Sequence, residues 1–132
     1  MKNLMKGILL LLFILPTLAL FSQAQNGKKL DPQNFEKQLK ESKDPILVDV
    51  RTPGEYAQGH LANSVLIDIN SDDFRSRISK LDKTKPVFVY CKAGSRSSSA
   101  VGVFEDLGFK EIYDLSGGII AWQKANKPVV KK

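Results

Sequence analysis

The chain has 132 residues, with 20 Lys and Arg, 14 Asp and Glu, one His, one Cys and 42% apolar residues. This length suits one domain, and the apolar content excludes a disordered chain. The single cysteine excludes an intrachain disulfide and a thiolate-rich zinc or iron–sulfur site, because each needs several sulfur atoms from one chain. We therefore expect neither a metal ion nor a cofactor.

The N-terminal segment has the pattern of a secretory signal peptide. Residues 1–6 carry two lysines and no acid, and residues 8–21 are apolar at every position except two, Pro16 and Thr17. The apolar run is shorter than the roughly 18 consecutive residues of a membrane-spanning helix, and a proline interrupts it. Ser22-Gln23-Ala24 then places small residues at the two positions that signal peptidase reads.

Cleavage is expected after Ala24, which divides the chain into a signal peptide, residues 1–24, and an exported domain, residues 25–132. The exported domain is then periplasmic or secreted in a bacterium, with no membrane span after cleavage. An uncleaved N-terminal anchor is the alternative, but the flanking residues lack a stop-transfer pattern.

Positive charge in the exported domain is concentrated at its two ends. Without Lys2 and Lys6 the chain keeps 18 basic and 14 acidic residues, a net charge of +4. Four of the basic residues lie in the tails: Lys28, Lys29, Lys131 and Lys132. The core of about residues 30–130 is therefore neutral. A nucleic-acid-binding protein concentrates its positive charge on one face. We therefore expect solvated charge in frayed tails and no nucleic-acid partner.

The first half of the exported domain alternates helix and strand patterns. Asp31-Pro32 resembles an N-cap followed by proline at the first helical position, which predicts a helix from Pro32 to about Lys40. The apolar run at 46–50 predicts a strand covered on both faces. A threonine and a proline open a short helix over 52–58, and a second apolar run at 65–69 predicts the next strand.

The second half repeats this alternation. We expect a helix over 71–81, a strand over 87–90, a helix over 97–107 that ends before Gly108, and a strand over 112–115. Gly117-Gly118 then form a tight turn into a last short helix, which holds Trp122 and stops at Pro128. Short apolar strands joined by helices predict an α/β domain with a mainly parallel sheet and helices on both faces.

Cys91 follows the strand at 87–90 directly, at the carboxyl end of the sheet where ligands bind in such folds. The loop 92–96 and a helix from about Ser97 come next. Unpaired backbone N–H groups, the helix dipole and the charges of Lys92 and Arg96 all favour the thiolate, which is the nucleophilic form. The alternative is a small buried side chain that only ends a strand.

Three segments carry recognisable motifs in order along the chain. They are Leu-Val-Asp-Val-Arg-Thr-Pro-Gly-Glu-Tyr at 47–56, continuing through Gly59-His60-Leu61; Val-Tyr-Cys-Lys-Ala-Gly-Ser-Arg-Ser at 89–97; and Leu-Ser-Gly-Gly-Ile-Ile-Ala-Trp at 115–122, with Pro128-Val129 beyond it. Together they span nearly all of the exported domain, and they resemble the signature segments of the rhodanese family of single-domain sulfurtransferases. The resemblance implies a rhodanese-like fold with a mainly parallel five-stranded sheet and helices on both faces.

By this resemblance Cys91 carries sulfur as a persulfide. The loop residues that would stabilise its thiolate and persulfide through backbone N–H groups are Lys92, Ala93, Gly94, Ser95, Arg96 and Ser97. The thiolate would attack a small anionic donor such as thiosulfate and pass the sulfur to cyanide or another thiophilic acceptor. Lys92 and Arg96 would orient the donor by charge. A free thiol in an oxidising compartment also favours a reducing or persulfide-loading partner protein.

Two alternative functions differ in the chemistry that they need. Phosphatases and arsenate reductases of related fold use a C-x5-R loop, whereas Cys91 to Arg96 is C-x4-R, Ser97 stands where the arginine would be, and no second thiol is present. A rhodanese-like module that binds a partner or carries persulfide, without small-molecule turnover, keeps the same fold and the same cysteine. The sequence does not choose the physiological donor or acceptor.

The remaining polar residues of the first motif are expected to be structural. Arg51 and Glu55 stand four residues apart, which predicts an ion pair between them. His60 is expected to be hydrogen-bonded within the fold, since the chemistry implied by the resemblance needs no general base.

Overall fold

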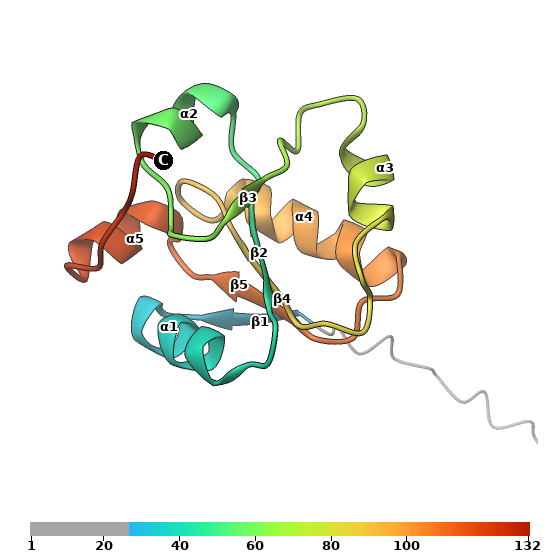
Figure 1. The fold of residues 1–132 in the computed structure, drawn as a ribbon, viewed down its shortest axis with the longest axis horizontal. Helices are drawn as coiled ribbons and strands as arrows, with labels where there is room; N and C mark the ends of the chain where they lie inside the picture. Colours follow the sequence, from blue (N-terminus) through green and yellow to red (C-terminus); the bar gives the residue numbers. More distant parts are fainter. Residues whose placement is uncertain (1–26) are drawn as a thin grey trace, which may run out of the picture.

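The computed structural model describes residues 27–132, so the predicted signal peptide lies outside the described residues. Ten elements follow one another along the chain in Figure 1. They are β1 (Gly27–Leu30), α1 (Pro32–Glu41), β2 (Ile46–Asp49), α2 (Pro53–Gln58), β3 (Val65–Leu66), α3 (Phe74–Ser79), β4 (Val87–Tyr90), α4 (Ser95–Asp106), β5 (Ile112–Leu115) and α5 (Gly118–Lys124).

The five strands form one sheet in the order β1-β5-β4-β2-β3, and every pair of neighbours is parallel. The predicted five-stranded parallel α/β fold is therefore confirmed. The strand β4 lies at the centre of the sheet, and all four of its residues are buried. A residue that directly follows β4 accordingly stands at the middle of the carboxyl edge, between the ends of β2 and β5.

Alternating strand residues divide the core into two layers. Val87 and Val89 of β4 pack with Ala100 and Phe104 of α4 and with the buried residues of α3, whereas Phe88 packs on the other side with α1 and α5. Figure 1 shows α1 and α4 on opposite sides of the sheet. The helices therefore cover both faces, as the apolar strands require.

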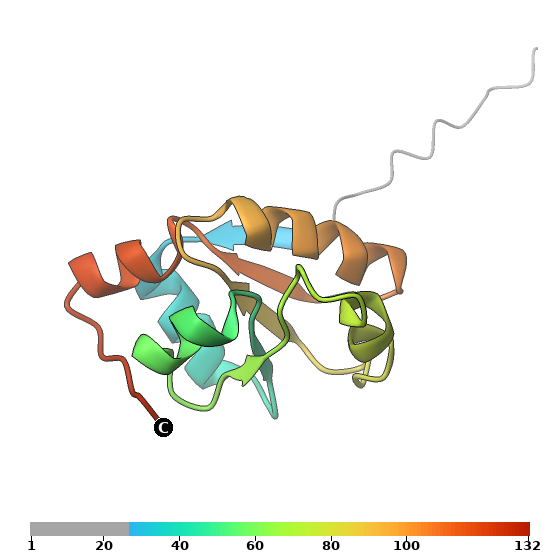
Figure 2. The ribbon, with the colours of Figure 1, turned by 90° about the horizontal axis from the view of Figure 1, so that it is seen from above.

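Local sequence signals set several helix ends. The Asp31 carboxylate accepts the Asn34 N–H at 2.8 Å and caps α1, and a reciprocal capping box between Thr52 and Glu55 opens α2. Gly108 follows α4 with φ +91°, a left-handed conformation that glycine adopts readily. The C-terminal segment returns from α5 toward α2, where Val130 and His60 form an antiparallel bridge (Figure 2).

The strand β1 was not expected from the sequence. The charge pattern predicts a frayed tail at residues 28 and 29, and this prediction is wrong, because Gly27–Leu30 pairs in parallel with Ile112–Leu115 of β5. The two lysines are exposed, as predicted, but they lie on an edge strand. Charged side chains are common on edge strands, where backbone hydrogen bonds and not side-chain burial hold the strand.

The bounds of three further elements differ by two or three residues from the expected ones. The third strand is limited to Val65–Leu66, α3 spans Phe74–Ser79 inside the predicted 71–81, and α4 begins two residues earlier than predicted, at Ser95. Element ends are set by local hydrogen bonds that periodicity does not reveal, such as the Ser71 hydroxyl bonded to the Asp68 carbonyl at 2.7 Å ahead of α3.

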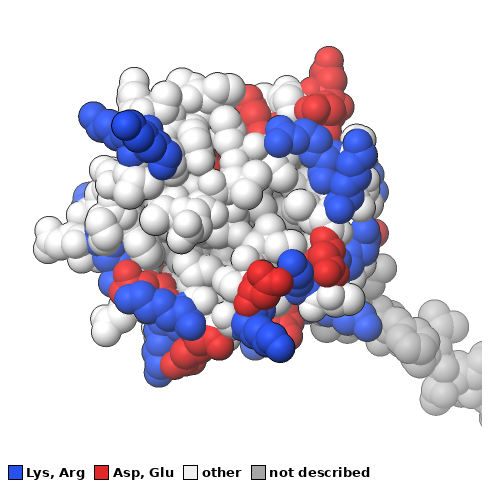
Figure 3. Space-filling model, viewed as in Figure 1, with Lys and Arg blue, Asp and Glu red and all other residues white. Residues whose placement is uncertain are grey.

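Charge on the surface is mixed. On the face shown in Figure 3, lysine and arginine side chains stand beside aspartate and glutamate around an uncharged centre. Within residues 27–132, no helix is long and apolar enough to span a membrane.

Candidate active site

Cys91 follows the central strand β4 directly and precedes the loop that leads into α4. Its side chain continues the alternation of β4 and lies in the core layer on the α4 side of the sheet. Gly94, the N-cap of α4, has φ +114°, which lets the backbone turn sharply under the thiol. The structure thus brings strand, cysteine, glycine loop and helix start together as predicted.

Two polar groups contact the Cys91 sulfur. The Gly94 N–H donates to Sγ at 3.0 Å, and the thiol itself donates to the Ser97 hydroxyl at 3.4 Å, which in turn donates to the Gly94 carbonyl at 3.1 Å. A hydroxyl can rotate, so on loss of the thiol proton Ser97 can donate to the sulfur instead. A thiolate or persulfide at Cys91 would then accept two hydrogen bonds.

The resemblance implies that the loop N–H groups stabilise a thiolate or persulfide, and around the thiol of this structure one of them contacts the sulfur. In residues 27–132, Gly94 is the only residue whose backbone N–H bonds to Sγ; those of Lys92, Ala93, Ser95, Arg96 and Ser97 do not. Cys91 is 1% exposed, while Lys92, Ala93 and Ser95 are exposed. The loop therefore forms the surface that an incoming molecule meets first, and the thiol lies beneath it.

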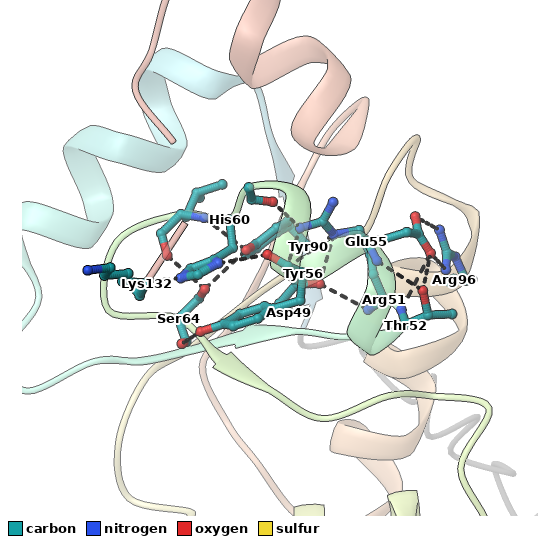
Figure 4. A network of polar contacts seen from close by, with 12 residues as sticks. Asp49, Arg51, Thr52, Glu55, Tyr56, His60, Ser64, Tyr90, Arg96 and Lys132 are labelled. Carbon is teal, nitrogen blue, oxygen red and sulfur yellow. Dashed lines mark hydrogen bonds and ion pairs between the residues drawn. The ribbon is translucent and has the colours of Figure 1, made fainter. Parts of the chain in front are cut away.

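Arg96, predicted to orient an anionic donor, is bound by a carboxylate of the protein. Its Nη1 donates to Glu55 Oε1 at 2.7 Å and its Nη2 to Oε2 at 2.9 Å, so the pair connects the start of α4 with α2. The Arg96 hydrogen bond, helped by Thr52, lowers the pKa of Glu55 from 4.5 to about 2 against the effect of burial. Glu55 in turn raises the pKa of Arg96. Figure 4 shows this contact at one end of a longer polar network.

The predicted ion pair between Arg51 and Glu55 is wrong. Arg51 instead binds Asp49 through Nε at 3.0 Å and Nη2 at 2.7 Å, and Nη2 also donates to the Gly59 carbonyl at 2.7 Å. The four-residue rule holds only within a helix, and Arg51 precedes the N-cap Thr52. Arg51 and Asp49 are buried, so this pair holds the turn after α2 against β2.

His60 lies in the same network but makes its contacts away from the thiol. Its Nδ1 lies 2.9 Å from the Tyr56 carbonyl oxygen and its Nε2 lies 3.2 Å from that of Lys132, while its ring stacks on Tyr56 with 3.6 Å between ring centroids (Figure 4). His60 is thus hydrogen-bonded within the fold, as expected from the sequence.

The third motif packs directly on the cysteine loop. The N–H of Ile119 donates to the Cys91 carbonyl at 2.9 Å, and the N–H of Ile120 donates to the Lys92 carbonyl at 3.1 Å. Gly118 has φ +61°, and a Cβ there would collide with the same two carbonyl groups. The tight turn expected at Gly117-Gly118 is therefore also a close approach between α5 and the loop, which sequence spacing did not reveal.

Lys92 lines a hollow of about 210 Å³ beside the cysteine loop. Its lining residues come from the end of β2, from α2, from the loop and from α5: Arg51, Glu55, Gln58, Gly59, Lys92, Ile119, Ile120 and Gln123. Lys92 forms no ion pair within residues 27–132. In the same range, no cluster of three His, Cys, Asp or Glu side chains could hold a metal ion.

Sequence reasoning missed Asp114 as a residue near the site. It lies on β5, is 2% exposed, and its Oδ2 accepts the Ser98 hydroxyl at 3.4 Å. Burial raises the pKa of Asp114, although the neighbouring Ser97 and Ser98 hydroxyls and the charge of Lys29 act in the other direction. The only available signal was an acid inside the apolar run of residues 112–115.

Together these features define a parallel α/β domain whose single cysteine lies in a glycine-containing loop, between the central strand and a helix N-terminus. The chain belongs to the family of rhodanese-like domains, whose model matches residues 31–125.

Relatives and solved structures agree with this family. A sulfurtransferase of Allochromatium vinosum is 32% identical over 102 residues, which cover 77% of this chain and 94% of that protein. A tRNA uridine(34) hydroxylase of Pelagibacter ubique is 36% identical over 108 residues, covering 81% of this chain but only 36% of that enzyme. The structure of a rhodanese-related protein from Thermoplasma volcanium matches with a TM-score of 0.70 and 30% identity, over 80% of this chain and 99% of that one. This chain thus spans about a third of the hydroxylase and nearly all of the sulfurtransferase.

Proposed function

We propose that the chain is an exported sulfurtransferase that moves a sulfane sulfur, from a donor such as thiosulfate to cyanide or a thiol acceptor, through a persulfide on Cys91. The observation that carries this proposal is the position of the Cys91 sulfur, at the carboxyl end of β4 with the Gly94 N–H and the Ser97 hydroxyl beside it. The sulfurtransferase of A. vinosum, which matches over most of its length, supports the same class of reaction.

The proposed reaction consists of two displacements at sulfur. The Cys91 thiolate attacks the outer sulfur of thiosulfate, a new S–S bond forms, and sulfite leaves with the electron pair of the broken S–S bond. Cyanide then attacks the outer sulfur of the persulfide, and thiocyanate forms as the Cys91 thiolate leaves. The cysteine returns to its starting state, so the cycle needs neither an external oxidant nor a second thiol.

Loop size favours sulfur over phosphate as the transferred group. Gly94 lies three residues after Cys91 and points its N–H at a single sulfur atom, and the loop is one residue shorter than the C-x5-R loop of the related phosphatases. Export is proposed from the signal-peptide pattern of residues 1–24.

The intact mass of the purified protein tests the persulfide directly. Incubation with thiosulfate should add the mass of one sulfur atom, and cyanide should remove it with formation of thiocyanate. Cys91→Ser should remain folded by circular dichroism and show neither change. If the reduced protein gains no sulfur although iodoacetamide alkylates Cys91, turnover of thiosulfate is refuted and a persulfide carrier or binding module becomes the better description.

A further inference from the structure

The guanidinium group beside the cysteine loop is not free to bind a substrate anion. Arg96 makes two parallel hydrogen bonds to Glu55, at 2.7 and 2.9 Å, which is the bidentate geometry that guanidinium and carboxylate groups prefer. An anionic donor that used Arg96 would have to displace Glu55.

Glu55 is held firmly in this position. Its Oε1 also accepts the Thr52 hydroxyl at 3.1 Å and the Thr52 N–H at 3.4 Å, as part of the capping box of α2. Its pKa of about 2 keeps it ionised at every pH at which the protein would work. The negative charge is therefore fixed both by the helix and by Arg96.

The surrounding charges leave Lys92 as the remaining cation of the hollow. The hollow beside the loop is lined by Glu55, Lys92 and Arg51, and Arg51 is bound to Asp49. With Arg96 and Arg51 each bound by a carboxylate, an incoming dianion meets two ion pairs whose charges cancel and one exposed lysine. This charge balance is weaker than the two free cations that the loop sequence suggested.

We propose that Glu55 is a specificity-determining residue that occupies Arg96, so that anionic donors such as thiosulfate bind less tightly than they would to a free guanidinium group. Persulfide donors R–S–SH with an uncharged R group gain relative to them; the Cys91 thiolate attacks their outer sulfur, and R–S⁻ leaves with the electron pair of the broken S–S bond. This inference rests on the proposed function for its substrates, but the charge selection itself acts on any reagent that reaches Cys91. A carboxylate outside the cysteine loop thus sets which sulfur compounds the loop accepts.

Alkylation of Cys91 tests this charge selection without any turnover. Iodoacetate and iodoacetamide have nearly the same shape and differ in charge, so the ratio of their rate constants reports how the site treats an anion. Glu55→Gln removes the charge but keeps the capping box, since glutamine also serves at that position. We expect the iodoacetate to iodoacetamide ratio to rise about fivefold in Glu55→Gln, which is the upper range for a partly exposed ion pair.

Two further variants make the result specific. Glu36→Gln removes the same charge from α1, where Glu36 binds Lys127 and Lys40, and should leave the ratio at the wild-type value. In Glu55→Gln, the additional change Arg96→Gln should return the ratio toward wild type, because the gain comes from the freed guanidinium. An unchanged ratio in a folded Glu55→Gln protein overturns the proposal. If that variant does not fold, Arg96→Gln alone decides: the freed carboxylate should lower the ratio, and no change refutes the role of Glu55.

Turnover provides the substrate arm of the test. The preference for thiosulfate over hydroxyethyl persulfide, measured as a ratio of kcat/KM, should rise in Glu55→Gln mainly through a lower KM for thiosulfate. A fall in thiosulfate use would show that Arg96 needs Glu55 to bind the donor, and would overturn the proposal. If neither donor is turned over, the proposed function fails while the alkylation ratios still decide the role of Glu55.

Discussion

The carboxyl group of Asp114 is 2% exposed on β5, and its Oδ1 has no hydrogen-bond partner among residues 27–132. Burial without full hydrogen bonding disfavours the charged form, and the pKa of Asp114 is accordingly raised above its ordinary value of 3.8. As pH rises through 3.8, the unfolded chain loses this proton before the folded chain does. Asp114 therefore opposes folding at neutral pH and has little effect in acid.

Asp114→Asn should for this reason stabilise the protein at neutral pH. We expect the free energy of unfolding to rise by about 1 kcal/mol at pH 7, because a buried, partly unpaired charge is replaced by a neutral amide. The gain should shrink as pH falls toward 3. Urea unfolding followed by the fluorescence of Trp122, the single tryptophan, measures both. Asp72→Asn, at an exposed position, is the matched control; an equal gain there, or a loss in Asp114→Asn, would contradict the explanation.

The sequence predicted the position of Cys91 in the fold, but not the carboxylates that bind Arg51 and Arg96. The position of Cys91 at the carboxyl end of β4 could be predicted because strand, cysteine, glycine loop and helix are contiguous in sequence. Arg51 and Arg96 could not, because each pairs with a carboxylate whose direction depends on the fold: Asp49 at the end of β2, and Glu55, which lies 41 residues from Arg96. The first pair lies two residues apart outside a helix and the second 41 residues apart, and neither spacing follows a helical period.

At the scale of elements, Glu55 connects two helices that are far apart in the sequence, α2 and α4. It is the third residue of α2 and binds the second residue of α4, so the pair fixes α2 against the start of the helix that follows Cys91. Both side chains are 27% exposed, and a pair with this exposure contributes at most about 1 kcal/mol to stability. The pKa of Glu55, lowered to about 2, means that this contribution is fully present above pH 4.5 and is lost as pH falls toward 2.

Glu55→Gln should therefore lower the free energy of unfolding by about 0.5–1 kcal/mol at pH 7, with a difference from wild type that fades in acid. Urea unfolding at pH 7, 5, 4 and 3 measures the trend. Glu41→Gln, at an exposed position at the end of α1, removes the same charge without breaking this pair and is the matched control. A difference that stays constant down to pH 3 would mean that the ion pair does not carry the effect.

Helices and buried strands could be predicted because their side chains carry the pattern, whereas β1 could not. The three buried strands β2, β4 and β5 are apolar runs, and the α1 and α2 starts carry N-cap residues and prolines. The strand β1 reads Gly-Lys-Lys-Leu, and its contribution is made by backbone pairing with β5, which sequence periodicity does not show. The close approach of Gly118 to the cysteine loop could not be predicted for the same reason, since it is a contact between backbone atoms.

At the scale of the whole molecule, β1 completes the sheet on the side of the third motif. The Leu30 carbonyl accepts the Ser116 N–H at 2.8 Å, and the next residues, Gly117 and Gly118, lead into the helix that packs on the cysteine loop. Cleavage after Ala24 would leave this strand in the exported domain, two residues from its new N-terminus. The edge strand thus supports the segment that holds the loop in place, although it is far from Cys91 in sequence.

A chain that begins at Asp31 should consequently be less stable, and its Cys91 thiol should be more accessible to solvent. Loss of the β1–β5 backbone hydrogen bonds and of the partly buried Leu30 should lower the free energy of unfolding by about 2 kcal/mol or more. Because Ser116 loses its partner, we also expect faster alkylation of Cys91 by iodoacetamide. Lys28→Gln in the chain that starts at Gln25 keeps the backbone pairing and should match the parent in both measurements. Equal urea midpoints for the chains that start at Gln25 and at Asp31 would show that β2, β3, β4 and β5 suffice for the sheet, and that β1 adds no stability.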